Sequence, residues 1–189
     1  MSEKKFALTV VTLYGVLILT SLGDPVMILS IGQLFMGGHL DLFFSLVPYG
    51  IVSILLVYLT FVAKETRARR FLFLMGMSIV IFFVVRDLNG EREKMHLTEF
   101  ALLGALIFWS AAIWGIKRHT AYLFVAMAGV ITVGLDELIQ AGLSLKLFSV
   151  RDILVNIIAV ALGAVLYGGL FLDSPREREK APASPSHSV

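Results

Sequence analysis

The chain consists of long apolar runs separated by short polar segments. Runs of about 15–22 residues suit transmembrane helices, because the hydrocarbon core is about 30 Å thick and a helix rises about 1.5 Å per residue. Backbone groups in lipid need internal partners, and the sequence lacks the alternation of a membrane barrel, so we expect helices. Six spans are predicted: Phe6–Leu22, Val47–Ala63, Phe71–Val85, Leu97–Ile116, Ala121–Ala141 and Ile153–Leu172.

Composition supports this fold class, an all-α polytopic bundle of about six transmembrane helices. Hydrophobic residues make up 58% of the 189 residues and charged residues 16%, which excludes an ordinary soluble domain. The bundle is predicted over residues 1–173, followed by a disordered tail over 174–189 that is rich in Pro, Ser and charge. The net charge of +2, without a basic patch, argues against nucleic-acid binding, and the lack of cysteine excludes disulfides and thiolate chemistry.

The segment 24–46 is unusually apolar for a loop and contains no Lys or Arg. It is predicted to be an interfacial or re-entrant helix, broken at Gly37-Gly38, with an irregular extra span as the alternative. Small residues in the last two spans, at Gly129, Gly134, Gly163 and Gly168, are expected to allow close helix packing.

The distribution of positive charge predicts the orientation. With the N-terminus in the cytoplasm, eleven of the sixteen Lys and Arg residues fall on the cytoplasmic side and five on the outer side. Both termini are therefore expected in the cytoplasm. The five outer cations all lie beside polar clusters: Arg86, Arg92, Lys94, Lys146 and Arg151.

Three polar clusters lie at ends of the last three predicted spans, and the topology places these ends on the outer side. Within a cluster, polar residues recur at i, i+3 or i, i+4, which puts them on one helix face. Ionisable groups beside lipid are costly unless they are paired or solvated, so the whole set favours a functional cavity. The clusters are Glu93, Lys94, His96 and Glu99; Asp136, Glu137 and Gln140; and Arg151, Asp152 and Asn156.

A structural reading remains open for each single residue. Asp152 could cap the sixth span, and Glu93 suits the positive end of the fourth helix. Asp136 and Arg151 could pair to hold the bundle together.

The functional reading assigns chemistry to the same residues. A carboxylate can orient an imidazole, so His96 and Glu99 could act as an acid–base pair, with Asp136 and Asp152 orienting the substrate. These four could instead hold a divalent metal, but no HExxH-type spacing supports that reading, so no cofactor is expected. The remaining candidates would contact substrate, their cations gripping a phosphate or carboxylate headgroup: Lys94, Glu137, Gln140, Lys146, Arg151 and Asn156.

The order of these residues resembles the VanZ-like family of membrane proteins over about residues 86–168. That family is known for a first member linked to low-level teicoplanin resistance. The resemblance implies a bacterial, multi-pass membrane protein with an outward-facing site near cell-envelope lipids, but it supplies no reaction. Phe100 stands where the family usually has Tyr. The residues that carry the resemblance are Glu93-x-x-His96-x-x-Glu99-Phe100, Asp136-Glu137-x-x-Gln140, a basic residue, and Asp152-x-x-x-Asn156.

Three classes of function remain open at this stage. The first is binding or modification of an anionic envelope amphiphile, either a phospholipid or a polyprenyl-phosphate-linked precursor. The second is a non-enzymatic scaffold or lipid-binding subunit. The third is a small-solute transporter, which the sequence disfavours because it shows no inverted repeat or pair of broken helices.

Overall fold

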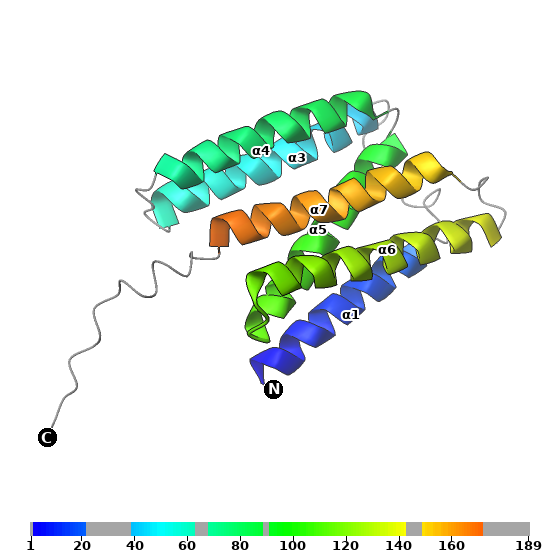
Figure 1. Ribbon diagram of the computed structural model, residues 1–189. Coiled ribbons are helices and arrows are strands. Elements are labelled where there is room, and N and C mark those ends of the chain that lie inside the picture. Colours follow the sequence, from blue (N-terminus) through cyan, green and yellow to red (C-terminus); the bar gives the residue numbers. More distant parts are fainter. Residues whose placement is uncertain (1, 22–38, 63–67, 89–90, 143–148, 172–189) are drawn as a thin grey trace, which may run out of the picture.

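The computed structural model describes residues 2–21, 39–62, 68–88, 91–142 and 149–171. This part of the chain is almost entirely helical, which confirms the all-α part of the prediction (Figure 1). The predicted tail, residues 174–189, lies outside the described residues, as does Lys146. The helices are α1 (Glu3–Ser21), α3 (Leu40–Val57), α4 (Ala68–Asp87), α5 (Glu91–Ile113), α6 (Arg118–Gly142) and α7 (Val150–Phe171), and a π-helical turn, η2 (Tyr58–Val62), continues α3.

Five of the described segments are long and apolar enough to cross a membrane, and they make the chain suited to a membrane-embedded bundle. α1 covers nearly all of the first predicted span but is not among the five. The five segments are Leu42–Phe61, Ala68–Asp87, Glu93–Ile113, Arg118–Gly142 and Val150–Phe171.

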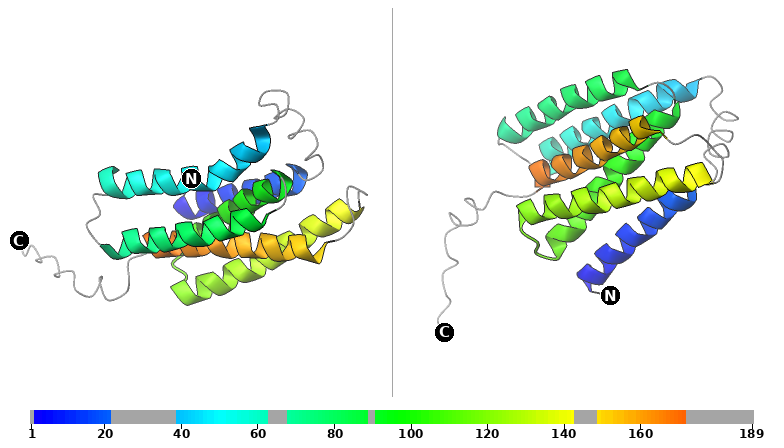
Figure 2. Two further views of the ribbon diagram at one scale, coloured as in Figure 1. Left: turned by 90° about the horizontal axis from the view of Figure 1, so that it is seen from above. Right: turned by 45° about the vertical axis from the view of Figure 1, so that its right-hand side comes forward.

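The helix α5 lies at the centre of the bundle. It packs against α7 along much of its length and also contacts α1, α3 and α6. In Figures 1 and 2, α3 and α4 form a pair on one side of α7, and α6 and α1 lie on the other. Half of the apolar stretch of α5 is buried, compared with 11% for the α3–η2 segment, so these two helices differ sharply in their surroundings.

The α5–α7 contact depends on two glycines that face the partner backbone. A Cβ at Gly163 would collide with the carbonyl oxygen of Ala101, and a Cβ at Gly104 would collide with that of Val160. Small residues at such a crossing let two membrane helices approach to backbone contact. Close packing is confirmed for Gly163 and was not predicted for Gly104.

Of the other three glycines predicted to allow close packing, two do so and one does not. A Cβ at Gly129 would meet the side chain of Val160, and one at Gly168 would meet Tyr122 and Phe108. A Cβ at Gly134 would meet nothing within 4 Å among the described residues, so the prediction of close packing there was wrong.

The ends of α5 differ from the predicted span Leu97–Ile116. The helix begins at Glu91, so His96 and Glu99 lie inside it rather than at its opening. It ends at Ile113 because Gly115 adopts a left-handed φ of 74°. The amide of Ile116 donates to the carbonyl of Ala111 and that of Gly115 to Ala112, both at 3.0 Å, which is a Schellman cap.

The helix α3 begins well before the predicted Val47. Its first residues, from Leu40, belong to the segment that was predicted to be interfacial, and the helix continues through the buried Pro48. Figure 2 shows that α3 bends in its N-terminal half, as a proline inside a helix commonly causes. The rest of the predicted interfacial helix, including Gly37-Gly38, lies outside the described residues.

The helix ends lie at two opposite ends of the bundle. The end of α4, the start of α5, the end of α6 and the start of α7 lie together at the right of Figure 1. Basic residues mark the other end, where the ammonium of Lys4 lies 5.5 Å from the ring centre of Trp114 and the guanidinium of Arg118 lies 5.9 Å from that of Tyr122. The polar clusters and these cations are therefore at opposite ends of the bundle.

Candidate functional site

Six polar side chains are buried in α5, α6 and α7, near the ends of these helices that lie together in Figure 1. None of them is more than 8% exposed, although all lie in helices with the length and composition of membrane spans. Buried ionisable groups in such helices face the bundle interior and often mark functional sites. We call this set the buried polar band: Lys94 and His96 on α5, Asp136, Glu137 and Gln140 on α6, and Asn156 on α7.

The α6 part of the band is linked internally. The side-chain amide of Gln140 donates to Oδ1 of Asp136 at 2.6 Å, which confirms that the i, i+4 spacing puts the two on one face. Asp136 is fully buried and Gln140 nearly so, so this bond lies away from water. Inside a helical bundle such a bond orients the Asp136 carboxylate.

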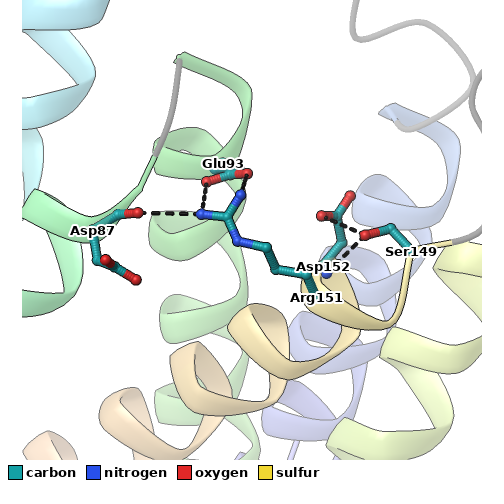
Figure 3. A network of polar contacts seen from close by, with 5 residues as sticks. All are labelled: Asp87, Glu93, Ser149, Arg151 and Asp152. Carbon is teal, nitrogen blue, oxygen red and sulfur yellow. Dashed lines mark hydrogen bonds and ion pairs between the residues drawn. The ribbon is translucent and has the colours of Figure 1, made fainter.

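The carboxylate of Glu137, about 100° around the helix from Asp136, contacts a different neighbour. Its Oε1 accepts a hydrogen bond from the backbone amide of Ser149 at 2.7 Å. Ser149 precedes α7, and its hydroxyl accepts the Asp152 amide at 3.2 Å and donates to the Asp152 carboxylate at 3.0 Å (Figure 3). This arrangement is that of a capping box, in which the hydroxyl of the N-cap residue accepts the amide of the third helical residue. The N-cap amide, which usually donates to the side chain of the third helical residue, donates here to Glu137 of α6.

The role of Ser149 was missed, although its signal is present in the sequence. A Ser followed three residues later by a carboxylate, before an apolar run, is the signature of a helix N-terminus. Ser149, not the predicted Asp152, occupies the N-cap position of the last helix, and Asp152 lies at the third helical position, where its carboxylate accepts the Ser149 hydroxyl. Asp152 is therefore part of the joint between α6 and α7.

Arg151 joins three helices at the same end. Its guanidinium makes a bidentate ion pair with Glu93, with N–O distances of 2.9 and 3.3 Å, and donates to the Asp87 carbonyl at 3.2 Å (Figure 3). Arg151 therefore pairs with Glu93 and not with Asp136, the partner suggested from the sequence. The side chain of Arg151 is 49% exposed, so the guanidinium remains at the surface of the bundle.

His96 and Glu99 form the predicted dyad. Nδ1 of His96 lies 3.3 Å from Oε2 of Glu99, and the His96 side chain is 7% exposed. Neither ring nitrogen makes a well-aligned hydrogen bond to a described residue. The hydroxyl of Tyr14 on α1 donates to the Glu99 backbone carbonyl at 3.2 Å, a contact across the bundle that no local sequence pattern indicated.

The four residues predicted as catalytic do not gather into one cluster. Within the described chain, His96 and Glu99 make no hydrogen bond or ion pair with Asp136 or Asp152. The described residues contain no group of three His, Asp or Glu side chains that could hold a metal ion. The site has two parts, the His96–Glu99 dyad and the α6–α7 joint. Asn156 is also buried, one turn after Asp152 on α7.

Comparison of this chain with protein-family models, with curated proteins and with solved structures gave no match.

Proposed function

We propose that this protein is a multi-pass, VanZ-like protein of the bacterial cytoplasmic membrane that binds or modifies an anionic cell-envelope lipid or lipid-linked precursor. The observation that supports this most is His96, a buried imidazole whose Nε2 has no hydrogen-bond partner among the described residues, while its Nδ1 lies 3.3 Å from Glu99 Oε2. Leaving a buried polar atom without a partner is costly, so such an atom is expected to meet a ligand or water. The neighbouring Glu99 equips the imidazole for proton transfer.

The distribution of charge supports an outward-facing site. Exposed cations at the end opposite the polar band, among them Lys4, Arg69, Lys117 and Arg118, are those that the positive-inside rule assigns to the cytoplasm. The band would then lie on the extracytoplasmic side, near envelope lipids. A link to glycopeptide resistance follows only from the resemblance to VanZ-like proteins.

Arg151 supports an anionic ligand. A guanidinium has five N–H donors, and Arg151 uses three of them on Glu93 and the Asp87 carbonyl. Because the side chain is half-exposed, its remaining donors can reach a phosphate or carboxylate at the bundle surface. Glu93 holds the guanidinium in place for that contact.

The polar contacts also favour a second candidate, a non-enzymatic scaffold or lipid-binding subunit. Glu137 and Asp152 secure the start of α7, and Arg151 ties α7 to α4 and α5. If these contacts are structural alone, Asp152→Asn keeps an acceptor for Ser149 and should leave function intact. A large loss of function with normal folding would exclude this reading.

The test is lipid-dependent stabilisation of the purified protein in mild detergent. A ligand that binds only the folded state raises the melting temperature. We expect phosphatidylglycerol to raise it more than phosphatidylcholine for the wild type, and we expect His96→Ala to lose that difference.

Ser110→Ala is the matched control. Ser110 is also a buried polar residue of α5, but it lies near the opposite end of the helix. It should retain the preference for the anionic lipid. An equal response of all three proteins to phosphatidylglycerol would refute a headgroup site at His96.

A further inference from the structure

The contact between His96 and Glu99 determines which nitrogen of the imidazole carries hydrogen. Nδ1 of His96 lies 3.3 Å from Oε2 of Glu99. A carboxylate offers only acceptor atoms, so we assign the neutral ring the tautomer with its hydrogen on Nδ1. The other ring nitrogen, Nε2, then carries a lone pair. In the uncharged ring Nε2 is therefore an acceptor and cannot donate a hydrogen bond.

Nε2 is buried and has no hydrogen-bond partner among the described residues. The ring of His96 lies 6.1 Å, centre to centre, from that of Phe100, which offers no polar atom. The side chain of Glu99 is 23% exposed, so the dyad reaches the surface of the bundle through its carboxylate. A buried polar atom without a partner is costly, so a ligand atom is expected at Nε2.

The charge of an anionic headgroup conflicts with this tautomer. The free oxygen atoms of an ionised phosphate are acceptors, as is the bare Nε2, so the two cannot share a hydrogen bond. A second proton on the ring removes the conflict, because an imidazolium donates from both nitrogens. Nδ1–H then remains with the Glu99 carboxylate, and Nε2–H makes a charge-assisted hydrogen bond to the phosphate.

The balance of charge favours the same arrangement. With Glu99 ionised and His96 neutral, the dyad carries one negative charge. An anion that bound alone would bring two negative charges together at a largely buried site, which is costly. An anion that binds with one proton leaves the net charge at one negative, and the imidazolium then lies between the two anions.

We propose that an anionic headgroup binds at Nε2 of His96 together with one proton taken up from water. The inference rests on the proposed function and adds to it a dependence of binding on pH. The affinity for the headgroup is highest where the imidazole is already charged, and it falls as the pH rises and the proton must be supplied. Glu99 acts as a positioning residue, since it holds the first hydrogen of the ring on Nδ1.

Other charged and titratable groups on the helices around α5 act on the imidazolium as well. Carboxylates favour a positive ring, and cations oppose it. Histidine is the side chain whose unperturbed titration falls between about pH 5 and 8, and substitution of His96 separates its contribution from theirs. These groups are Glu93 and Lys94 on α5, Tyr14 on α1, Tyr49 on α3, Asp136 and Glu137 on α6, and Arg151 and Asp152 on α7.

The experiment measures the dissociation constant of short-chain phosphatidylglycerol as a function of pH. The full-length protein in mild detergent is titrated by calorimetry between about pH 5 and 8, with short-chain phosphatidylcholine as the zwitterionic reference. The phosphate diester of phosphatidylglycerol stays singly ionised throughout, so a change in affinity reports on the protein. For the wild type we expect the affinity to be constant at the acid end and to fall by up to about tenfold per pH unit at the alkaline end.

Glu99→Gln tests the role of the carboxylate. The amide of glutamine can donate to Nδ1, which allows the neutral ring to carry its hydrogen on Nε2. We therefore expect this variant to bind phosphatidylglycerol more tightly than the wild type at about pH 8 and to lose most of the pH dependence. A Glu99 that only supports the fold would instead weaken binding at every pH.

Two histidine variants provide the controls. His96→Gln keeps a polar side chain without a titratable ring, so its affinity should no longer change with pH in this range. His119 is an exposed histidine at the start of α6, at the opposite end of the bundle. His119→Ala should therefore retain the wild-type pH profile, and loss of the profile in this variant would overturn the assignment to His96.

The outcomes separate the two proposals. A preference for phosphatidylglycerol that His96→Ala abolishes, but that does not change with pH in the wild type, would overturn the proton uptake and keep the headgroup site. In that case Nε2 would accept a hydrogen bond from a lipid hydroxyl. A wild type with no preference for phosphatidylglycerol at any pH would overturn the proposed function and the proton uptake with it.

Discussion

The inner helices α5, α6 and α7 differ from the outer pair α3 and α4 in how their polar groups are satisfied. In the outer pair, the hydroxyls of Thr60 and Ser78 donate to carbonyls of their own helices. In the inner three, polar groups join separate elements, as Glu137 does with Ser149 and Arg151 with Glu93. The polar contacts of the inner helices therefore fix how separate elements lie against one another, whereas these hydroxyls of the outer pair do not.

Glycines show the same difference. Gly163 of α7 faces the backbone of Ala101, whereas a Cβ at Gly76 of α4 or Gly50 of α3 would meet nothing within 4 Å among the described residues. Among the described glycines, those that face a partner backbone are therefore at the α5–α7 crossing, within the helices that carry the polar band.

The largest expected effect comes from breaking the inner crossing. Gly163→Ala should destabilise the protein by about 3 kcal/mol, because its Cβ collides with a backbone atom that cannot move freely. Gly76→Ala in the outer pair should be neutral or slightly stabilising, since alanine favours helix and the site is open. Thermal unfolding in detergent, followed by circular dichroism, measures both. Equal stability of the two variants would remove the distinction between the regions.

A smaller effect is expected from the buried hydrogen bond of α6. Asp136→Ala leaves the Gln140 amide without its 2.6 Å acceptor and should cost about 1–2 kcal/mol. Ser78→Ala is the outer control and should cost less than about 0.5 kcal/mol, because its hydroxyl bonds only within its own helix. The same unfolding assay applies, and a cost for Ser78→Ala as large as that for Asp136→Ala would contradict the comparison.

The capping box gives the next effect in size. Ser149→Ala should destabilise the protein by about 1 kcal/mol, because it removes the hydroxyl that accepts the Asp152 amide. Ser149→Thr keeps a hydroxyl that can both accept the Asp152 amide and donate to its carboxylate, and should recover most of the loss. Hydrogen exchange at the first turn of α7 would show faster exchange in the alanine variant only. Unchanged protection in that variant would mean that the cap does not hold the start of α7.

The smallest effect on stability is expected at Arg151. Half-exposed ion pairs contribute little, so Arg151→Ala should cost no more than about 1 kcal/mol despite its bidentate contact with Glu93. If Arg151 binds the headgroup, the same variant should nevertheless weaken the preference for phosphatidylglycerol. A stable variant with an unchanged lipid preference would mean that Arg151 only connects helices and does not bind the headgroup.

The sequence predicts the fold class and the polar residues better than it predicts the helix ends. Apolar length identified the spans, but it placed the start of α5 at Leu97 although the helix begins at Glu91. Hydropathy follows the membrane, whereas helices continue through polar residues until a terminator such as Gly115 stops them. His96 and Glu99 therefore lie within α5 rather than at its start.

The contacts within a helix were predictable and those between helices were not. The pairs Asp136–Gln140 and His96–Glu99 follow from spacing alone. The Tyr14 contact with the Glu99 carbonyl depends on how α1 packs, which no local pattern specifies. The Ser149 cap could have been predicted from its spacing to Asp152.

The most direct test of the account is native mass spectrometry of the protein in mild detergent, comparing the wild type with His96→Ala. The account predicts that the wild type carries a bound anionic lipid and that the variant, folded to the same extent, has lost it. A wild type that carries no lipid, or a variant that retains the same lipid at the same occupancy, would contradict the claim that the buried polar band is a headgroup site.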